Sequence, residues 1–280
     1  MSVALISRDT LMEAVRTLPS APRILSELAR LLDNPDSELA EVAQLLKRDA
    51  ALTARIIRVS NSTYYNTGTP HASLEDALAR VGFTEVYRLT GFATAAQLAD
   101  ERLPFYRIKG VELRDNSLLS ALIIEALAKE VKTDPRVAYT AGLLRSLGKI
   151  ALNRIARDQE QAGGFDLQAN ESLVLREIYL AGVSNCEVTA MILQAWGFAD
   201  VTIEAIRHHY LTDPLAPPLA RLLNIAAGMT ERCGFGLRGE TYYVEPLSST
   251  YEAVGISAPA VEEAVVRAYA IFSSLREAGI

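Results

Sequence analysis

Helical periodicity runs through almost the whole chain of 280 residues, and it limits the fold more than any other feature. Apolar residues recur every three or four positions, and long alternating strand patterns are missing. Polar caps and Pro or Gly stops divide this pattern. Asp134-Pro135 supplies an N-cap and a first-turn proline, and Gly82 closes a short helix that Ser73 opens. We therefore predict an all-α protein.

The pattern falls into two series of helices with short connections, as in helical bundles. The expected helices lie at about 21–32, 38–48, 50–60, 74–81, 85–99, 111–132, 134–156, 171–182, 184–197, 200–210, 217–233 and 259–278. The segment DERLPFYRIKG combines proline, glycine and mixed charge just before a longer helix, so we place the boundary there. We predict two packed helical bundles, residues 1–108 and 109–280.

The charge of the chain disfavours nucleic acid as a partner. The formal net charge is −6, and half of the residues are hydrophobic, enough for a large core. The acidic excess lies after residue 110, and no basic stripe with interleaved aromatic residues occurs. Because an acidic surface repels a phosphate backbone, we expect no nucleic-acid binding.

The sequence also lacks the signals of secretion or membrane insertion. The first ten residues, MSVALISRDT, do not join a basic leader to a long apolar run, and the most hydrophobic segment, 118–128, contains Glu125. Two cysteines far apart support neither a disulfide framework nor a zinc knuckle. We expect a cytoplasmic protein that does not enter the membrane.

Histidine is scarce, and two of the three histidines are adjacent, His208 and His209. Neighbouring helical residues point about 100° apart, so both side chains cannot easily bind one ion. A metal site also needs further ligands, and no other histidine is near in the sequence. We expect one of the pair to interact with the carbonyl groups at the end of its helix.

A polar segment between two expected helices, NSTYYNTGTPHAS, holds two adjacent tyrosines. Asn61, Ser62, Tyr64 and Tyr65 are the candidates for an interaction loop, because ordered loops often carry function. The alternative is structural: Asn61 ends a helix, and the tyrosines fold back onto the bundle.

Several separated motifs in register resemble the HDOD domain, the HD-related output domain of bacterial signalling proteins. The first half shows Leu18-Pro19, Asp49 before ALTAR, Asn61-Ser62 and ALARVG at 77–82; the second shows YTAGLLRSLGKIAL, EVTAMILQAWGF and AIRHHY. The resemblance covers about residues 15–230. One departure is Ala50, where the family usually has proline after the aspartate.

The second half is similar to the core of catalytic HD phosphohydrolases, in which the L-L-x-x-x-G-K frame carries a His-Asp pair of metal ligands. Here the frame GLLRSLGK carries Arg145-Ser146. The resemblance places the other ligand positions near Asn116, Asn185 and Ala227, and only His208 or His209 remains of the histidines. The resemblance therefore implies a degenerate site.

Coordination chemistry agrees with this interpretation. A hydrolytic dication needs several lone-pair donors, and a guanidinium donates none. Arg145 at about 4 Å from a dication would cost roughly 8 kcal/mol at an effective dielectric constant of about 20. We expect no metal and no cofactor. Arg145 either pairs with an acidic residue of its own half and plugs the site, or joins Lys149 and His208 or His209 in binding an anion such as a nucleotide phosphate.

The leading hypothesis is a non-catalytic HDOD-type interaction module in bacterial signal transduction. Its partners would be signalling proteins that the sequence does not name. They would bind at the 61–72 loop, at the groove between the two halves, or at both. Two alternatives remain open: a metal-dependent phosphohydrolase of the HD superfamily, and a sensor of a nucleotide such as a cyclic dinucleotide that uses the vacated pocket.

Overall fold

The computed structural model describes residues 8–278, except 17, 19–20, 63, 66–67, 71, 99, 159–171, 212–214 and 245–247. In the first half, these residues form α1 (Arg8–Arg16), α2 (Ala21–Asp33), α3 (Leu39–Leu46), α4 (Ala50–Ser60), α5 (Leu74–Val81), α6 (Phe83–Leu98), β1 (Arg102–Leu103) and β2 (Ile108–Lys109). The second half comprises α7 (Gly110–Glu130), α8 (Pro135–Leu144), α9 (Leu147–Asp158), α10 (Leu173–Ala181), α11 (Asn185–Ala195), α12 (Asp200–His208), α13 (Pro218–Thr230), the π-helical turn η1 (Glu231–Phe235), α14 (Ser248–Val254) and α15 (Ala258–Glu277). The predicted all-α class is confirmed.

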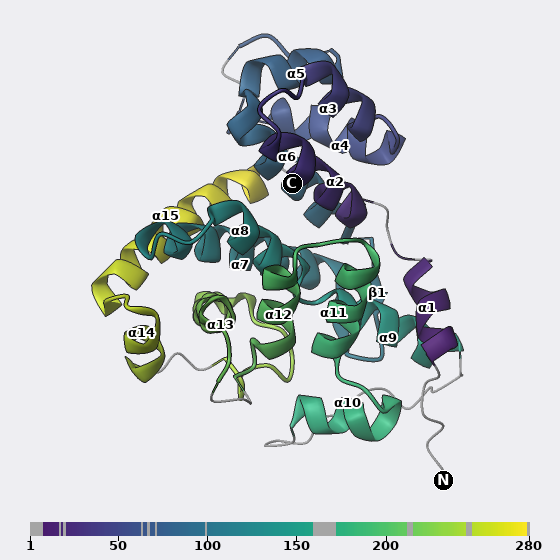
Figure 1. Ribbon diagram of the computed structural model, residues 1–280, viewed down its shortest axis with the longest axis vertical. Helices are drawn as coiled ribbons and strands as arrows, with labels where there is room; N and C mark the ends of the chain where they lie inside the picture. Colours follow the sequence, from purple (N-terminus) through teal and green to yellow (C-terminus); the bar gives the residue numbers. More distant parts are fainter. Residues whose placement is uncertain are drawn as a thin grey trace.

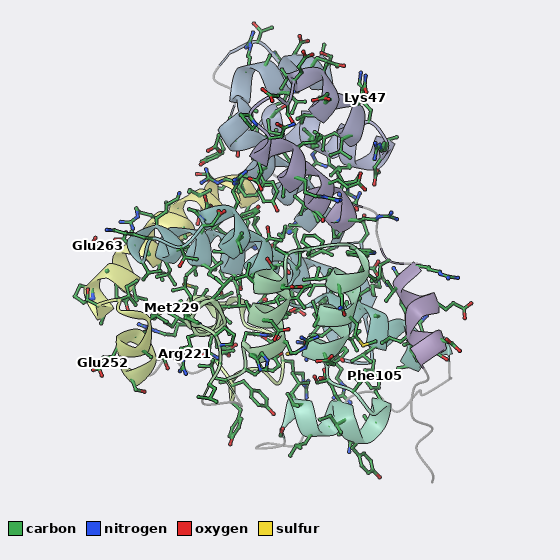
Figure 2. All side chains as sticks on the ribbon, in the orientation of Figure 1. Lys47, Phe105, Arg221, Met229, Glu252 and Glu263 are labelled. Atoms are coloured by element: carbon green, nitrogen blue, oxygen red, sulfur yellow. The ribbon has the colours of Figure 1, made fainter. Side chains whose placement is uncertain are left out.

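The helices gather into two groups, which Figure 1 shows one above the other. Helices α2 to α6 form the upper group, from which the exposed side chain of Lys47 projects (Figure 2). Helices α7 to α15 form the lower group, in which α7 packs against α8, α13 and α15. Helix α1 lies beside α9 of the lower group, although it comes first in the chain.

Local capping explains many of the helix ends. The Asp49 carboxylate accepts a hydrogen bond from the Leu52 amide at 2.8 Å, and the Ser73 hydroxyl caps α5 in the same way. At the other end of α5, Gly82 adopts a φ of 75°, a conformation that side chains with a Cβ atom rarely take. These are the signals that made the helical segments predictable.

One expected helix is wrong: residues 134–156 form two helices, α8 and α9, because the chain turns at Arg145-Ser146. The Thr189 hydroxyl, from α11, accepts a hydrogen bond from the Gly148 amide at 2.8 Å. This bond satisfies one of the amides that a new helix leaves without an intrahelical partner. The polar pair at 145–146 therefore marks a helix boundary inside the core.

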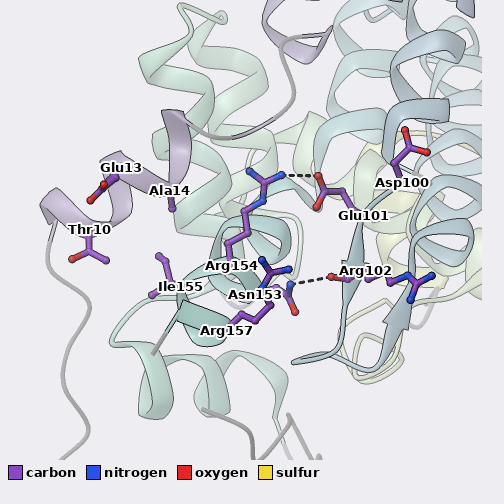
Figure 3. A pocket seen from close by; sticks show the side chains of 10 residues that line it. All are labelled: Thr10, Glu13, Ala14, Asp100, Glu101, Arg102, Asn153, Arg154, Ile155 and Arg157. Carbon is purple, nitrogen blue, oxygen red and sulfur yellow. Dashed lines mark hydrogen bonds and ion pairs between the residues drawn. The ribbon is translucent and has the colours of Figure 1, made fainter. Parts of the chain in front are cut away.

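The predicted boundary segment contains a feature that helical periodicity did not predict, a short antiparallel hairpin in which the strands β1 and β2 have two residues each. Figure 3 shows how α9 holds it: the Asn153 amide donates to the Arg102 carbonyl at 3.0 Å, and Arg154 pairs with Glu101 at 2.6 Å. Helices α1 and α14 were also not predicted. The division at residue 108 stays a prediction, since α6 packs against both α7 and α8 across it.

Candidate functional site

Arg145 is almost completely buried, and it is the largest such side chain in the described part of the chain. Its Nη2 donates to Asn116 Oδ1 at 2.6 Å, and its Nη1 lies 2.7 Å from Glu240 Oε2. Asn116 comes from the middle of α7, and Glu240 from the loop after η1. Arg145 of the GLLRSLGK segment therefore points into the core and pairs with an acidic residue of its own half of the chain.

Lys149, in the first turn of α9, is directed at the same carboxylate. Its Nζ lies 2.6 Å from Glu240 Oε1, 3.0 Å from the Tyr210 hydroxyl and 3.2 Å from Asn185 Oδ1. The lysine and the glutamate are 0% and 1% exposed. One buried carboxylate thus bridges two buried cations, an arrangement that we call the buried cluster: Arg145, Lys149 and Glu240 with their partners Asn116, Asn185, His209 and Tyr210.

The close approach of α9 and α11 makes this geometry possible. A Cβ atom at Gly148 would lie 2.0 Å from the Asn185 carbonyl oxygen, so a larger residue would force the two helices apart. Asn185 begins α11, where the Ser184 hydroxyl accepts a bond from the Glu187 amide. The glycine before Lys149 therefore lets the lysine reach the first residue of α11.

The two adjacent histidines have separate environments. His209 is fully buried; its Nδ1 lies 2.7 Å from the Ile206 carbonyl and its Nε2 lies 3.5 Å from Arg145 Nη1. The expected contact with carbonyl groups at the helix end is thus confirmed for His209. His208 is half-buried and lies 3.4 Å from Glu204 of its own helix. The buried cluster includes His209 and not His208.

A second buried carboxylate lies behind Asn185. Glu177 of α10 accepts hydrogen bonds from the Asn185 amide at 2.7 Å, from Asn185 Nδ2 at 2.9 Å and from the Tyr106 hydroxyl at 2.8 Å. Burial raises the pKa of Glu177, and Lys149 and these donors oppose that shift. With Glu177 ionised, two carboxylates balance the charges of Arg145 and Lys149.

The protonation states in the cluster follow from burial and from the neighbouring charges. Burial alone would raise the pKa of Glu240, but Arg145 and Lys149 outweigh it and hold this pKa well below its ordinary value. Burial, reinforced by the charge of Arg145, lowers the pKa of His209 to about 3. At neutral pH the glutamate is therefore ionised and the histidine is neutral.

The donor atoms that a metal ion would need are already bonded within the cluster. Asn116 Oδ1 accepts from Arg145, both Glu240 oxygens face cations, and His209 Nε2 faces the guanidinium. In the described residues, no three or more His, Cys, Asp or Glu side chains are grouped so that they could hold a metal. The residues present do not fit the divalent metal of the HD phosphohydrolases.

The remaining ligand positions add no donor to the cluster. Ser146 is buried, and its hydroxyl has no hydrogen-bond partner among the residues that the structure describes. Ala227 is buried on α13, which packs against the helix of Asn116. An anion at Arg145 and Lys149 would have to compete with Glu240. Nucleotide binding there stays a prediction.

Sequence reasoning missed Glu240, Glu177 and Tyr210. Glu240 lies between the expected helices at 217–233 and 259–278, and its partners Lys149 and Tyr210 are 91 and 30 residues away in the chain. The burial of Glu177 was not predicted. This glutamate faces inward on a short helix whose exposed residues include Leu175 and Tyr179. A helix on which apolar residues are exposed and a charged residue is buried reverses the usual pattern, and this reversal could have indicated a buried carboxylate.

The candidate interaction loop packs partly against the upper helices. Asn61 is the C-cap of α4, as the structural alternative expected, and Ser62 is buried. The rings of Tyr64 and Tyr65 are in edge contact at 4.8 Å, and Tyr65 also packs near Phe92 of α6 at 6.2 Å. Both tyrosines remain half-buried.

The loop adjoins a cavity at the junction of the two helical groups. This junction cavity has a volume of about 560 Å³ and is lined by residues of α2, α6, α7 and α8. Arg88 lies at its edge between two carboxylates, 2.9 Å from Glu85 and 2.6 Å from Glu125, and Tyr139 contributes an apolar wall. The Tyr65 hydroxyl donates to Glu85 at 3.3 Å, which links the loop to the cavity.

Comparison with known proteins identifies the family. The model of the HDOD domain family matches residues 18–212, more than half of the chain. The chain belongs to the HDOD family. This match confirms the resemblance that the sequence motifs gave, and it includes Asn116, Arg145, Asn185 and His209; Glu240 lies beyond the matched residues.

Solved structures of several bacterial proteins share the fold of this chain. An HDOD domain protein of unknown function from Geobacter sulfurreducens is 22% identical, with a TM-score of 0.70 over 97% of this chain and 99% of that one. A "Putative phosphohydrolase" from Shewanella amazonensis SB2B is also 22% identical, with a TM-score of 0.65 over 96% and 97%. A "Putative signal transduction protein" from Marinobacter aquaeolei VT8 is 21% identical, with a TM-score of 0.66 over 99% and 67%. At this identity the likeness shows the fold alone.

A curated relative from Treponema pallidum, an uncharacterized protein, is 23% identical over 238 residues. The match covers 82% of this chain and 45% of the relative, so the chain spans less than half of that protein.

Among the described residues, no helix combines the length and the apolar character needed to cross a bilayer.

Proposed function

We propose that this HDOD protein is a non-catalytic interaction module in bacterial signal transduction. The observation that carries the proposal is the buried cluster, in which Glu240 bridges Arg145 and Lys149 at 2.7 and 2.6 Å. A dication near this carboxylate would meet two cations, each repelling it by roughly 8 kcal/mol at about 4 Å and an effective dielectric constant of about 20. Its ligands would also have to leave their present partners.

Metal binding and phosphodiesterase activity test the non-catalytic part of the proposal. The purified protein is titrated with Mn²⁺ and Zn²⁺, and its metal content and its hydrolysis of bis-p-nitrophenyl phosphate are measured. The proposal expects less than one tenth of an equivalent of bound metal and no hydrolysis above that of the buffer. One equivalent of bound metal, with hydrolysis that His209→Gln abolishes and His208→Gln preserves, would refute it.

The partner surface that we propose combines the junction cavity with Tyr64 and Tyr65. A cavity where two helical groups meet is a common place for a binding site, and half-buried tyrosines are frequent anchors in interfaces. The charges at the rim form a network, because Lys129 lies 3.3 Å from the carboxylate of Glu125 that also pairs with Arg88. A partner with both apolar and charged groups matches this surface.

A pull-down from cell lysate tests the docking surface. The wild-type chain, a Tyr64→Ala/Tyr65→Ala variant and a Tyr242→Ala control are used as bait, and captured proteins are quantified by mass spectrometry. Tyr242 is 79% exposed and lies in the second half of the chain, so it controls for the loss of an exposed tyrosine elsewhere. We expect the double variant to lose partners that the control retains; an unchanged partner list for all three baits would eliminate this surface.

A further inference from the structure

Glu240 differs from its neighbours in the loop after η1. Its side chain is 1% exposed, whereas Arg238, Thr241 and Tyr242 are exposed to solvent. Gly239, directly before it, has a φ of 86°, a conformation that favours glycine and lets the chain turn the carboxylate inward. A surface loop thus inserts one charged side chain into the core.

Three donors from other parts of the fold converge on this carboxylate. Arg145 Nη1 lies 2.7 Å from Oε2; Lys149 Nζ at 2.6 Å and the Tyr210 hydroxyl at 3.0 Å meet Oε1. Arg145 follows α8, Lys149 lies on α9 and Tyr210 follows α12. None of the three donors therefore belongs to the loop. Two cations and a hydroxyl around one carboxylate make a dry, charge-assisted site for an oxyanion.

Bonds that do not involve Glu240 hold the two cations in place. Asn116 Oδ1 accepts from Arg145 at 2.6 Å, and Asn185 Oδ1 accepts from Lys149 at 3.2 Å. Both asparagines are fully buried and anchored in turn, by the Phe235 carbonyl and by Glu177. The donors are therefore preorganised by the helical core, and the glutamate is the group that enters between them.

We infer that Arg145, Lys149 and Tyr210 form an oxyanion-binding site that Glu240 fills from within the chain. The ligand class is a carboxylate or a phosphate group, because either presents the two oxygens that the donors need. A tethered group has an effective concentration in the millimolar range or above, so a free carboxylate competes poorly in the wild-type protein. The inference is independent of the proposed function, since an interaction module can contain or lack such a site.

Chemical rescue tests the site directly. Glu240→Ala removes a CH₂–COO⁻ group, whose heavy atoms match those of acetate. Thermal unfolding of the wild type, Glu240→Ala and Arg145→Met/Glu240→Ala is followed at constant ionic strength while chloride is replaced by acetate or by inorganic phosphate. We expect a saturable rise in the Tm of Glu240→Ala of about 3–6 °C at about ten times the Kd, beyond the rise in the other two proteins.

The two anions distinguish the ligand classes, and the variants exclude a general salt effect. A specific rise with acetate assigns a carboxylate site, and one with phosphate alone assigns a phosphate site. Excluded salts stabilise any folded protein and raise all three Tm values alike. Glu101→Ala is the matched control, because Glu101 is 18% exposed and pairs with Arg154 outside the buried cluster. Equal anion dependence in all variants would overturn the site.

The test also covers a Glu240→Ala chain that does not fold in chloride. Its refolding yield is then measured with acetate and with phosphate, and recovery that requires Arg145 supports the site. Glu240→Gln, which keeps the side-chain volume, is made in parallel. No recovery of the alanine variant in either anion, together with an anion-independent Tm of the glutamine variant, would reduce Glu240 to an ordinary structural ion pair.

Discussion

Two charge networks in this molecule have the same arrangement with the signs of the charges reversed. At the junction cavity, one cation, Arg88, lies between two carboxylates at 2.9 and 2.6 Å; in the buried cluster, one carboxylate, Glu240, lies between two cations at 2.7 and 2.6 Å. The distances are similar, but the environments differ. Arg88 is 16% exposed and borders a cavity, whereas Arg145 is 1% exposed.

The difference shows what burial does to a set of charges. At the junction, water screens the ion pairs and can solvate a partner that is lost, so such a network can exchange partners at a small cost. In the core, each charge has to be matched by another protein group, because an unpaired ion there is very unfavourable. We therefore propose partner recognition for the first network, and for the second a balance of charges inside the core.

The largest expected effect contrasts two arginine substitutions. Arg145→Met is expected to lower the free energy of unfolding by about 3–5 kcal/mol, because it leaves part of a buried network without its partners. Arg88→Met is expected to cost about 1–2 kcal/mol, since solvent compensates for part of the loss. Urea unfolding at pH 7.5 measures both. Equal losses would remove the distinction between the two networks.

The next effect is the dependence of stability on pH. Burial lowers the pKa of His209 to about 3, so between that value and about 6.5 the unfolded chain binds a proton that the folded chain does not. The stability from neutral His209 is complete above about pH 6.5 and is lost as the pH falls toward 3. The expected slope is about 1.4 kcal/mol per pH unit at most.

The adjacent histidines provide a matched pair for this prediction. His209→Gln should flatten the fall in the free energy of unfolding between about pH 6.5 and 5, and His208→Gln should leave it unchanged. Glu240 adds loss of the same sign only below about pH 4.5, because its folded pKa is depressed. Urea unfolding at half-unit pH steps measures the slope; a flattened slope in His208→Gln alone would contradict the burial argument.

The smallest effect tests how closely the loop is tied to the junction. Tyr65→Phe removes one long hydrogen bond, 3.3 Å from its hydroxyl to Glu85, and keeps the ring that packs near Phe92. We expect a loss of about 0.5–1 kcal/mol in unfolding free energy. The matched change Tyr87→Phe removes a buried bond to Thr140 at 2.5 Å and should cost more. A larger loss of unfolding free energy for Tyr65→Phe than for Tyr87→Phe would contradict the view that the bond to Glu85 is weak.

Much of the fold followed from the sequence, because caps, stops and periodicity are local signals. The helix after Asp134 began as expected, but the break at Arg145-Ser146 did not follow from periodicity. At that break, the Gly148 amide donates to the Thr189 hydroxyl, which lies 41 residues further along the chain. Local patterns carry no information on such a partner.

The candidate site was also predictable only in part. The HD-like frame indicated Arg145, Asn116 and Asn185 as positions of one site, and the structure brings them into the buried cluster. Glu240 was out of reach, because a loop without periodicity gives no direction for a side chain. The choice between His208 and His209 needed the packing of α12, which buries one ring and leaves the other half-buried.

Diffraction at a wavelength where manganese scatters anomalously, from crystals grown with excess Mn²⁺, tests whether the buried cluster excludes a metal ion. We predict that the map shows the Glu240 carboxylate between Arg145 and Lys149, with no anomalous peak in the buried cluster. A manganese peak at bonding distance from Glu240 and His209, with Arg145 turned away, would contradict the claim that ion pairs have replaced the metal site.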